Sequence, residues 1–155
     1  MALAEVPVGL PKSSVSWTRV PLDYVDDCWE RVAGFLERGV GESRGRYDIR
    51  ALYDELMCGH QHLWVVFKDG DTVVAAFTTM FTSYPGRTNL SVVFCGSDDS
   101  MGGVSGMWSN VMLDIIEWAK INGCSAVEVA GRRGWARVFR DLGFKESYVM
   151  IEAEV

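Results

Sequence analysis

Apolar residues recur with a helical period in two segments of the first third of the chain. From residue 23 to residue 38 they fall on one face, at Cys28, Trp29, Val32, Ala33, Phe35 and Leu36. Aspartates precede this face at positions 23, 26 and 27, where a helix dipole favours negative charge. A second pattern of this kind covers residues 48–57, after the glycine-rich stretch GVGESRGR. The period predicts two amphipathic helices, over residues 23–38 and 48–57.

The period changes to two in the middle of the chain. Alternating apolar residues predict strands over residues 63–67, 72–82 and 89–95. The turn-forming sequences KDGD and YPG separate these three segments. We therefore expect an antiparallel meander of three strands.

Helical and strand patterns alternate in the last third. Residues 107–121 predict a helix, residues 125–130 a strand and residues 148–154 a final strand. Between these strands, the stretch GRRGWARVFRDLGF has apolar residues at helical spacing, at Trp135, Val138, Phe139 and Leu142. Gly143 follows them, where a left-handed C-cap needs a residue without a side chain. A helix that ends at Gly143 is the prediction for this stretch.

This order of elements predicts the fold class. Two helices, three antiparallel strands and alternating helices and strands indicate an α/β (α+β mixed) fold, with a central, mostly antiparallel mixed sheet of about 5–6 strands and helices on both faces. A length of 155 residues fits one domain, which we place at residues 21–155. Residues 1–20 contain Pro7, Gly9 and Pro11 and predict an extended N-terminal arm, expected to contact copies of the chain or other proteins.

Composition and charge narrow the classes of function. The net charge of −6 and the pI near 4.9 disfavour nucleic acid as a partner, and no apolar run is long enough to predict a membrane helix. The first residues lack a secretory signal pattern, so we expect a protein that is not secreted by a signal peptide. The four cysteines are scattered without a CxxC pair, which predicts free thiols and no metal site.

In element order, from Trp17 to Val155, the sequence resembles the GNAT family of acetyl-coenzyme A-dependent N-acetyltransferases. The resemblance is most specific in WAKINGCSAVEVAGRRGWARVFRDLGF. The motifs HLWVVF, TSYPGR, WAKINGC and GRRGWARV are similar, more narrowly, to small GNAT-like proteins encoded by tailed bacteriophages. A GNAT-like fold is therefore expected.

The resemblance implies an acetyl-coenzyme A site with two parts. The pantetheine arm would lie between diverging strands, against Val93, Phe94 and Cys95. The pyrophosphate would rest on the glycine-rich loop at the start of the next helix, made of Gly102, Gly103, Val104, Ser105 and Gly106. Two aspartates precede this loop and no cation lies within it, which disfavours a diphosphate. The alternative is a flexible loop in which Ser105 caps the helix.

The resemblance also directs attention to catalytic groups. Many GNAT enzymes have a proton-donating tyrosine four residues before the glycine of the last helix, and here that position is Phe139. Asp98 and Asp99 follow the third predicted strand, in the usual neighbourhood of a water-relayed base, and Tyr148 or Tyr84 would have to replace the missing acid. A solvated turn is the alternative for the two aspartates.

Two groups of basic residues, a pair of histidines and a set of arginines, each have more than one interpretation. His60 and His62 precede the first predicted strand and are interpreted as surface or capping residues, with a base as the alternative. The arginines at 132, 133, 137 and 140 would suit the 3′-phosphate of coenzyme A, an acidic partner or a solvated helix face.

Two functions follow from these residues. The poor fit of the loop and the missing acid favour a non-catalytic structural or assembly component of a tailed-phage particle, without a cofactor, which would reside in the host cytoplasm and then in the virion with other virion proteins as partners. The alternative is an active N-acetyltransferase that uses acetyl-coenzyme A and acetylates an amine of a small molecule or protein.

Overall fold

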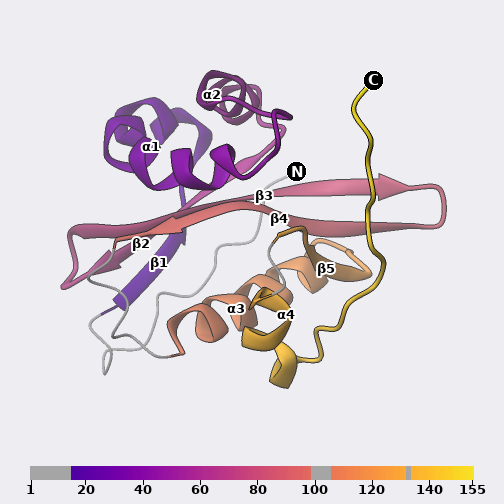
Figure 1. The fold of residues 1–155 in the computed structure, drawn as a ribbon. Helices are drawn as coiled ribbons and strands as arrows, with labels where there is room; N and C mark the ends of the chain where they lie inside the picture. Colours follow the sequence, from indigo (N-terminus) through magenta and orange to yellow (C-terminus); the bar gives the residue numbers. More distant parts are fainter. Residues whose placement is uncertain (1–14, 99–105, 132–133) are drawn as a thin grey trace.

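The computed structural model describes residues 15–98, 106–131 and 134–155 (Figure 1). Its elements, in chain order, are β1 (Val15–Arg19), the 3-10 helix η2 (Leu22–Tyr24), α1 (Val25–Gly41), α2 (Ile49–Met57), β2 (His62–Lys68), β3 (Thr72–Tyr84), β4 (Arg87–Ser97), α3 (Met107–Ile121), β5 (Ala126–Val129), α4 (Gly134–Val138) and the 3-10 helix η4 (Arg140–Leu142). No helix in these ranges is both long enough and apolar enough to cross a bilayer.

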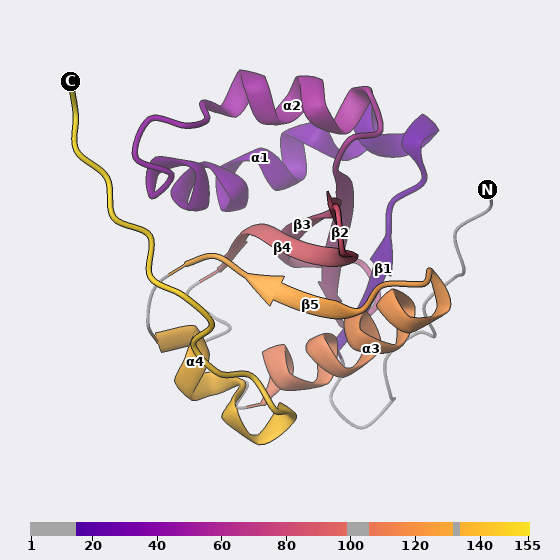
Figure 2. The same cartoon turned by 90° about the vertical axis from the view of Figure 1, so that its right-hand side faces the viewer.

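The strands form one sheet in the order β1-β2-β3-β4-β5. The first four are antiparallel neighbours, and β5 lies parallel to β4. Short turns suffice between antiparallel neighbours, whereas the parallel pair needs a crossover, which α3 provides. Figure 2 shows α1 and α2 on one face of this sheet and α3 and α4 on the other. The predicted fold class is therefore confirmed, with five strands.

Each face of the sheet has its own layer of buried side chains, because residues alternate between the faces along a strand. On β2, Leu63 and Val65 belong to the layer under α1 and α2, while Trp64 and Val66 belong to the layer under α3. The helices complete these layers with Val32, Leu36, Leu52 and Leu56 on one side, and with Val111, Ile115 and Trp118 on the other, where Phe139, between α4 and η4, also packs.

Helix α1 rests directly on the backbone of β4. A Cβ atom built on Gly96 would lie 1.9 Å from the carbonyl oxygen of Phe35, and one built on Gly39 would lie 3.2 Å from the carbonyl oxygen of Cys95. Real Cβ atoms do not approach backbone atoms as closely as the first distance. Glycine at 96 is therefore required for the position of α1 over the sheet.

The sheet includes a strand that the sequence analysis did not predict. Residues Val15 to Arg19 pair with β2, from Val15 opposite Lys68 to Arg19 opposite Trp64. These residues fall within the predicted extended arm, because five residues beside a proline-containing segment give too short a pattern to predict a strand. Val15 and Trp17 are buried in the layer under α3, so this part of the chain is held by its own sheet. Residues 1–14 lie outside the described residues.

The predicted strand over residues 148–154 is absent from the sheet, and this prediction is wrong. The segment has no regular secondary structure, and Figure 2 shows it rising past the α1–α2 connection. Its apolar side chains are largely exposed, at 73% for Tyr148, 71% for Val149, 67% for Met150 and 91% for Ile151. A local pattern indicates β-propensity, but a strand also needs a neighbour with which to form hydrogen bonds.

Candidate active site

Strand β4 has a β-bulge in its pairing with β3. Phe77 of β3 is opposite Cys95 and Thr79 is opposite Val92, so three residues of β4 span the length of two on β3. The parallel pairing of β4 with β5 ends at Val92 and Val129, although β4 continues to Ser97. The strand edge of β4 beyond the bulge therefore has no β5 partner.

The bulge is fixed by a side chain. The fully buried Thr78 hydroxyl accepts a hydrogen bond of 3.3 Å from the backbone N–H of Phe94. The bulge interrupts the backbone hydrogen bonds between β3 and β4, and this bond gives the buried N–H of Phe94 a partner. Of the three residues expected to meet pantetheine, Phe94 thus has its N–H engaged, while Val93 and Cys95 flank it on the same stretch of β4.

A small apolar cavity lies at the point where β4 and β5 separate. It measures about 20 Å³, room for about one water-sized group. Its wall consists of Phe77, Val92, Cys95, Trp108, Val111, Met112, Ile115, Val129, Trp135 and Phe139. Phe139 is only 2% exposed and stacks on Trp135 with ring centroids 5.3 Å apart. The position at which the resemblance expected a proton donor is therefore part of the apolar wall.

The opposite face of the same strand pair presents a polar cluster centred on Glu128. Its carboxylate accepts hydrogen bonds from Tyr84 Oη (2.8 Å), Asn89 Nδ2 (2.9 Å) and Ser91 Oγ (2.7 Å). The Asn89 amide oxygen in turn accepts a bond of 2.9 Å from Arg87 Nε. We call these five residues the Glu128 cluster.

Strand register builds this cluster. Ser91 is directly opposite Glu128 in the β4–β5 pair, and Asn89 lies two residues earlier on the same face of β4. Their neighbours Leu90 and Val127 point to the layer under α3. Figure 1 shows that α1 and α2 lie over one part of the sheet, while the β3–β4 hairpin that bears Tyr84 and Arg87 extends past them. The cluster is accordingly on a part of this face that the two helices leave uncovered.

The surroundings keep the carboxylate ionised. Desolvation alone would raise the pKa of Glu128, but the hydrogen bonds from Asn89, Ser91 and Tyr84, together with the charge of Arg87, outweigh it and hold the pKa below its ordinary value. The hydrogen bond to Glu128 is the main cause of a raised pKa of Tyr84, to which desolvation and the nearby Tyr148 also contribute. At neutral pH the site is therefore an ionised carboxylate that accepts hydrogen bonds from the surrounding side chains.

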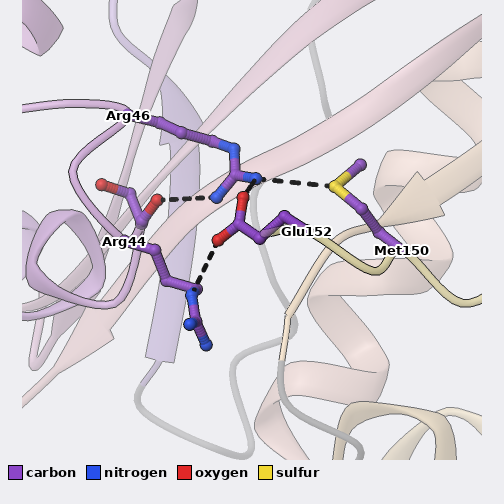
Figure 3. A network of polar contacts seen from close by, with 5 residues as sticks. Arg44, Arg46, Met150 and Glu152 are labelled. Atoms are coloured by element: carbon purple, nitrogen blue, oxygen red, sulfur yellow. Dashed lines mark hydrogen bonds and ion pairs between the residues drawn. The ribbon is translucent and has the colours of Figure 1, made fainter. Parts of the chain in front are cut away.

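The C-terminal segment passes beside this cluster and is attached to the α1–α2 connection. Glu152 pairs with Arg44 (Nε to Oε1, 2.9 Å) and with Arg46, whose guanidinium also lies 3.6 Å from the sulfur of Met150 (Figure 3). Arg46 donates in addition to the carbonyl of Ser43 at 3.2 Å. These side chains are exposed, so solvent weakens the ion pairs.

The other candidate residues from the sequence lie apart from the Glu128 cluster. Asp98 is exposed beyond the far end of β4, where its N–H donates to the carbonyl of Val74 (2.8 Å) and its side chain lines an open hollow with α1 residues. From Ser91 to Asp98 the strand covers about 20 Å at its usual rise. Tyr148, by contrast, is close to Tyr84 of the cluster and is 73% exposed.

The predicted pyrophosphate loop is only partly described. Asp99, Gly102, Gly103, Val104 and Ser105 lie outside the described residues, as do Arg132 and Arg133. Gly106 is described: it has a left-handed backbone with φ of 85° and is the N-cap residue of α3. The alternative expectation of Ser105 as the cap is therefore wrong, because α3 begins at Met107, as predicted, and the residue before it is Gly106. Arg137 and Arg140 are exposed on α4 and η4.

His62 is half-buried against the aromatic side chains under α3, in contrast to the expected surface or capping position. Its Nδ1 lies 2.9 Å from Thr79 Oγ1, and its ring meets Phe81 and Trp118 edge to face. Desolvation, together with the charge of Arg19, lowers the pKa of His62 to about 4. A neutral imidazole on the α3 face, away from Glu128, does not form part of the candidate site.

Glu128 is the central residue of the candidate site, and sequence reasoning did not single it out. Its signal was a single carboxylate between two valines in the predicted strand AVEV, which is ordinary for the exposed side of a strand. The register with β4 brings Asn89 and Ser91 to it, and Tyr84 reaches it from 44 residues earlier. The residues next to Glu128 in the sequence do not indicate which side chains will contact it. Across the described residues there is no group of three or more side chains suited to hold a metal ion.

Comparison with known proteins gives the class of fold. No protein-family model matches the sequence, and no curated protein matches it. Among solved structures, this chain is similar to a transcriptional regulator from Bacillus halodurans C-125, with a TM-score of 0.69, 21% identity and coverage of 91% of this chain and 99% of that one.

Two acetyltransferase structures extend the comparison. A predicted acetyltransferase from Clostridium acetobutylicum, determined with acetyl-CoA, has a TM-score of 0.66 at 11% identity over 90% of this chain and 96% of that one. Glucosamine-6-phosphate N-acetyltransferase from Arabidopsis thaliana has a TM-score of 0.64 at 11% identity, over 90% and 97%. The chain has the GNAT-like acetyltransferase fold. None of these similarities points to a phage particle.

Proposed function

We propose that the protein is an acetyl-coenzyme A-dependent N-acetyltransferase whose acceptor is a cationic amine bound at Glu128. The observation that carries this proposal is the position of an ionised, triply hydrogen-bonded carboxylate one residue before the point where β4 and β5 separate. The fold comparison supports it, since one similar structure contains acetyl-CoA. An aminoglycoside acetyltransferase in complex with sisomicin is also similar, at 12% identity and a TM-score of 0.68.

The free edge of β4 and the apolar cavity beside it fit two parts of acetyl-coenzyme A, the pantetheine arm and the acetyl group. Acetyl-coenzyme A supplies an activated acyl group as a thioester. The edge of β4 beyond Val92 has no β5 partner and would hold the pantetheine amides, as a strand edge can. The apolar cavity whose wall includes Val92 and Val129 is of the size of a methyl group. Gly102 to Gly106 remain the predicted seat of the pyrophosphate.

The chemistry assigned to the chain's own residues is binding and orientation. The Glu128 carboxylate binds the acceptor ammonium, and Tyr84, Asn89 and Ser91 fix its orientation. A carboxylate with a lowered pKa is a weak base, so the ammonium proton leaves to water while Glu128 keeps the nitrogen in place. The neutral nitrogen then attacks the thioester carbonyl carbon, a C–N bond forms, a second N–H proton leaves to water and the C–S bond breaks. Proximity supplies most of the acceleration, and water protonates the leaving thiolate because Phe139 has no proton to donate.

Binding of the donor can be tested at a cysteine. Cys95 lines the cavity at the strand divergence, whereas Cys58 is exposed at the end of α2. Acetyl-coenzyme A is expected to bind with micromolar affinity in calorimetry and to slow alkylation of Cys95, measured by mass spectrometry, while alkylation of Cys58 is unchanged. Equal alkylation of Cys95 with and without acetyl-coenzyme A, and no heat of binding, would contradict the proposal.

Binding of the acceptor can be tested at Glu128. In an assay of coenzyme A release with a panel of primary amines and polyamines, Glu128→Gln should raise the KM for the amine about 10- to 100-fold, the value of one charge-assisted interaction, with a smaller effect on kcat. Glu117→Gln is the matched control, because Glu117 is exposed on the outer side of α3. An unchanged KM in Glu128→Gln would exclude the assigned role.

The other function expected from the sequence is a non-catalytic component of a tailed-phage particle. It rested on the poor diphosphate seat, in a loop of which only Gly106 is among the described residues, and on the missing acid at Phe139, which lies in the apolar wall. Neither ground points to a phage particle. Absence of acetyl-coenzyme A binding in the test above would return that hypothesis to first place.

A further inference from the structure

The connection between α1 and α2 presents two arginines to one carboxylate. Arg44 Nε lies 2.9 Å from Glu152 Oε1, and the Arg46 guanidinium pairs with the other oxygen of the same carboxylate (Figure 3). Within the described residues, Glu152 is the one acidic partner of both arginines. Two positive charges therefore meet a single negative charge, and guanidinium groups are well suited to bind a carboxylate.

The backbone of this connection brings the two arginines together. Arg44 and Gly45 are both left-handed, with φ of 57° and 80°, and Ser43 Oγ accepts a hydrogen bond of 3.1 Å from the N–H of Tyr47. The carbonyl of Ser43 accepts a bond of 3.2 Å from Arg46 Nη1, while Arg46 Nη2 pairs with the carboxylate. These contacts shape the connection without any help from Glu152. We call its five residues, from Ser43 to Tyr47, the arginine loop.

Stability does not account for the arginine loop. A left-handed conformation disfavours a residue other than glycine by about five- to thirtyfold, and Arg44 adopts it. An exposed ion pair shifts an equilibrium by at most about fivefold, and the side chains of the two arginines are 75% and 46% exposed. The apolar side chains of Tyr148 to Ile151, just before Glu152, also stay 67–91% exposed. The contact with Glu152 thus offsets little more than the cost of the loop conformation, and another carboxylate can replace it.

The arginine loop lies over the bulge of β4. The Tyr47 ring packs edge to face on Phe94 with centroids 5.1 Å apart, and Phe94 lies in the bulged stretch. Phe94 is three residues beyond Ser91, which donates to Glu128, so this contact is about 10 Å along the strand from the Glu128 cluster. Tyr47 and Phe94 belong to the layer under α1 and α2, the face that also bears the cluster. A cationic site and an anionic site are therefore within reach of one small ligand.

We propose that the arginine loop binds a carboxylate of the acceptor, and that Glu152 fills the loop until the acceptor binds. The acceptor is then an amine that also carries a carboxylate, with its ammonium on Glu128 and its carboxylate on Arg44 and Arg46. The amine end of this inference rests on the proposed function, whereas the arginine loop is supported by its own contacts. A ligand held at Glu128 keeps its carboxylate near the loop, as the chain keeps Glu152 there, so the two compete at similar effective concentrations.

A series of ω-amino acids from β-alanine to aminooctanoic acid, with alkylamines of matching length, tests the inference. In the assay of coenzyme A release, the ratio of kcat/KM for an amino acid to that for its matched alkylamine measures what the carboxylate contributes. The double variant Arg44→Gln/Arg46→Gln should lower this ratio about tenfold or more at the best chain length, the value of a charge-assisted interaction. Glu152→Gln should raise the ratio, because it removes the competing carboxylate.

The opposite signs distinguish ligand binding from a structural ion pair. If the pair only attached the C-terminal segment, the arginine variant and Glu152→Gln would change the ratio in the same direction or leave it unchanged, and either result would overturn the proposal. Arg50→Gln and Glu154→Gln are the matched controls, since both are exposed charged residues outside the two sites, and each should retain the wild-type ratio. Circular dichroism of each variant establishes that it is folded.

Calorimetry with the same amino acids separates this inference from the proposed function. If no amine leads to release of coenzyme A, the proposed acetyl transfer is wrong, but the arginine loop is still tested by binding. Tighter binding to Glu152→Gln than to the wild type, and weaker binding to Arg44→Gln/Arg46→Gln, would support the carboxylate site by itself. No binding to either the wild type or Glu152→Gln would overturn it as well.

Discussion

At the scale of single residues, the most informative side chain is Glu128. Three hydrogen bonds and Arg87 hold its pKa below the ordinary value of 4.5, against the effect of desolvation. This makes the residue a permanent negative charge under physiological conditions, suited to binding an ammonium group. A residue that served as a general base would instead need a pKa raised toward neutrality.

The pH dependence of amine binding follows from this difference. A group with a depressed pKa contributes its charge at all pH values above the ordinary 4.5 and loses it only as the pH falls through the still lower folded pKa. The dissociation constant of the amine, measured by calorimetry with coenzyme A present, should therefore be constant from pH 7.5 to about 5. A loss of affinity already near pH 6 would show that Glu128 takes up a proton and has the properties of a base.

His62 gives a second prediction, for stability. Its pKa falls from 6.5 to about 4 on folding, because desolvation and Arg19 disfavour the charged ring. The unfolded chain therefore takes up a proton first, and the free energy of unfolding should decrease as the pH falls from about 6.5 to about 4, by up to about 3 kcal/mol at 1.36 kcal/mol per pKa unit. In urea unfolding, His62→Gln should show a smaller decrease over this range. His60→Gln, at a largely exposed histidine, should retain the wild-type decrease.

At the scale of elements, the contact between α1 and β4 decides how the two helices lie over the sheet. The backbone of β4 at Gly96 meets the Phe35 carbonyl so closely that any side chain would displace the helix. The same stretch of β4 follows the bulge and lacks a β5 partner. The position of α1 and the strand divergence are thus properties of one short segment.

Substitution of two glycines tests this contact. Gly96→Ala should lower the free energy of unfolding by about 2–3 kcal/mol or more, because it overpacks a backbone contact. Gly34→Ala, in the middle of α1 with no atom within 4 Å of the new Cβ, should instead raise it by about 0.5–1 kcal/mol through helix propensity. Chemical denaturation of both variants measures the difference, and a destabilised Gly34→Ala or a neutral Gly96→Ala would contradict the account of α1.

At the scale of the whole molecule, the two faces of the β4–β5 pair carry different parts of the proposed reaction. The apolar cavity lies on the α3 and α4 side, and the Glu128 cluster lies on the α1 and α2 side. Donor and acceptor would meet where the strands separate. A ligand bound where β4 and β5 diverge would contact the layers on both faces of the sheet. It should therefore stabilise the molecule as a unit.

Thermal unfolding measures this effect. Acetyl-coenzyme A at about 100 times its dissociation constant should add about 2.7 kcal/mol to the free energy of unfolding, which raises the Tm by about 5–10 °C for a domain of this size. Desulfo-coenzyme A should have a similar effect, while adenosine alone should have little. A Tm that acetyl-coenzyme A leaves unchanged would indicate that the strand divergence is not a binding site.

The sequence by itself determined the elements and their order. Period and turn residues predicted α1 to α3 and β2 to β5 closely, and the left-handed Gly143 was expected after the last helix. These features are local, since they depend on which residues share a face or form a cap within a few positions. The mixed α/β class followed from the order of these elements, and the GNAT-like fold was expected from the resemblance to that family.

Only the tertiary structure decided which side chains act together. Glu128 meets Tyr84 because two strands 44 residues apart in sequence share one face of the sheet, and no local pattern contains that register. Residues 148–154 have the pattern of a strand but lack a neighbour, and residues 15–19 became a strand because β2 offered one. Pairing is a property of two segments, and a sequence pattern describes only one of them.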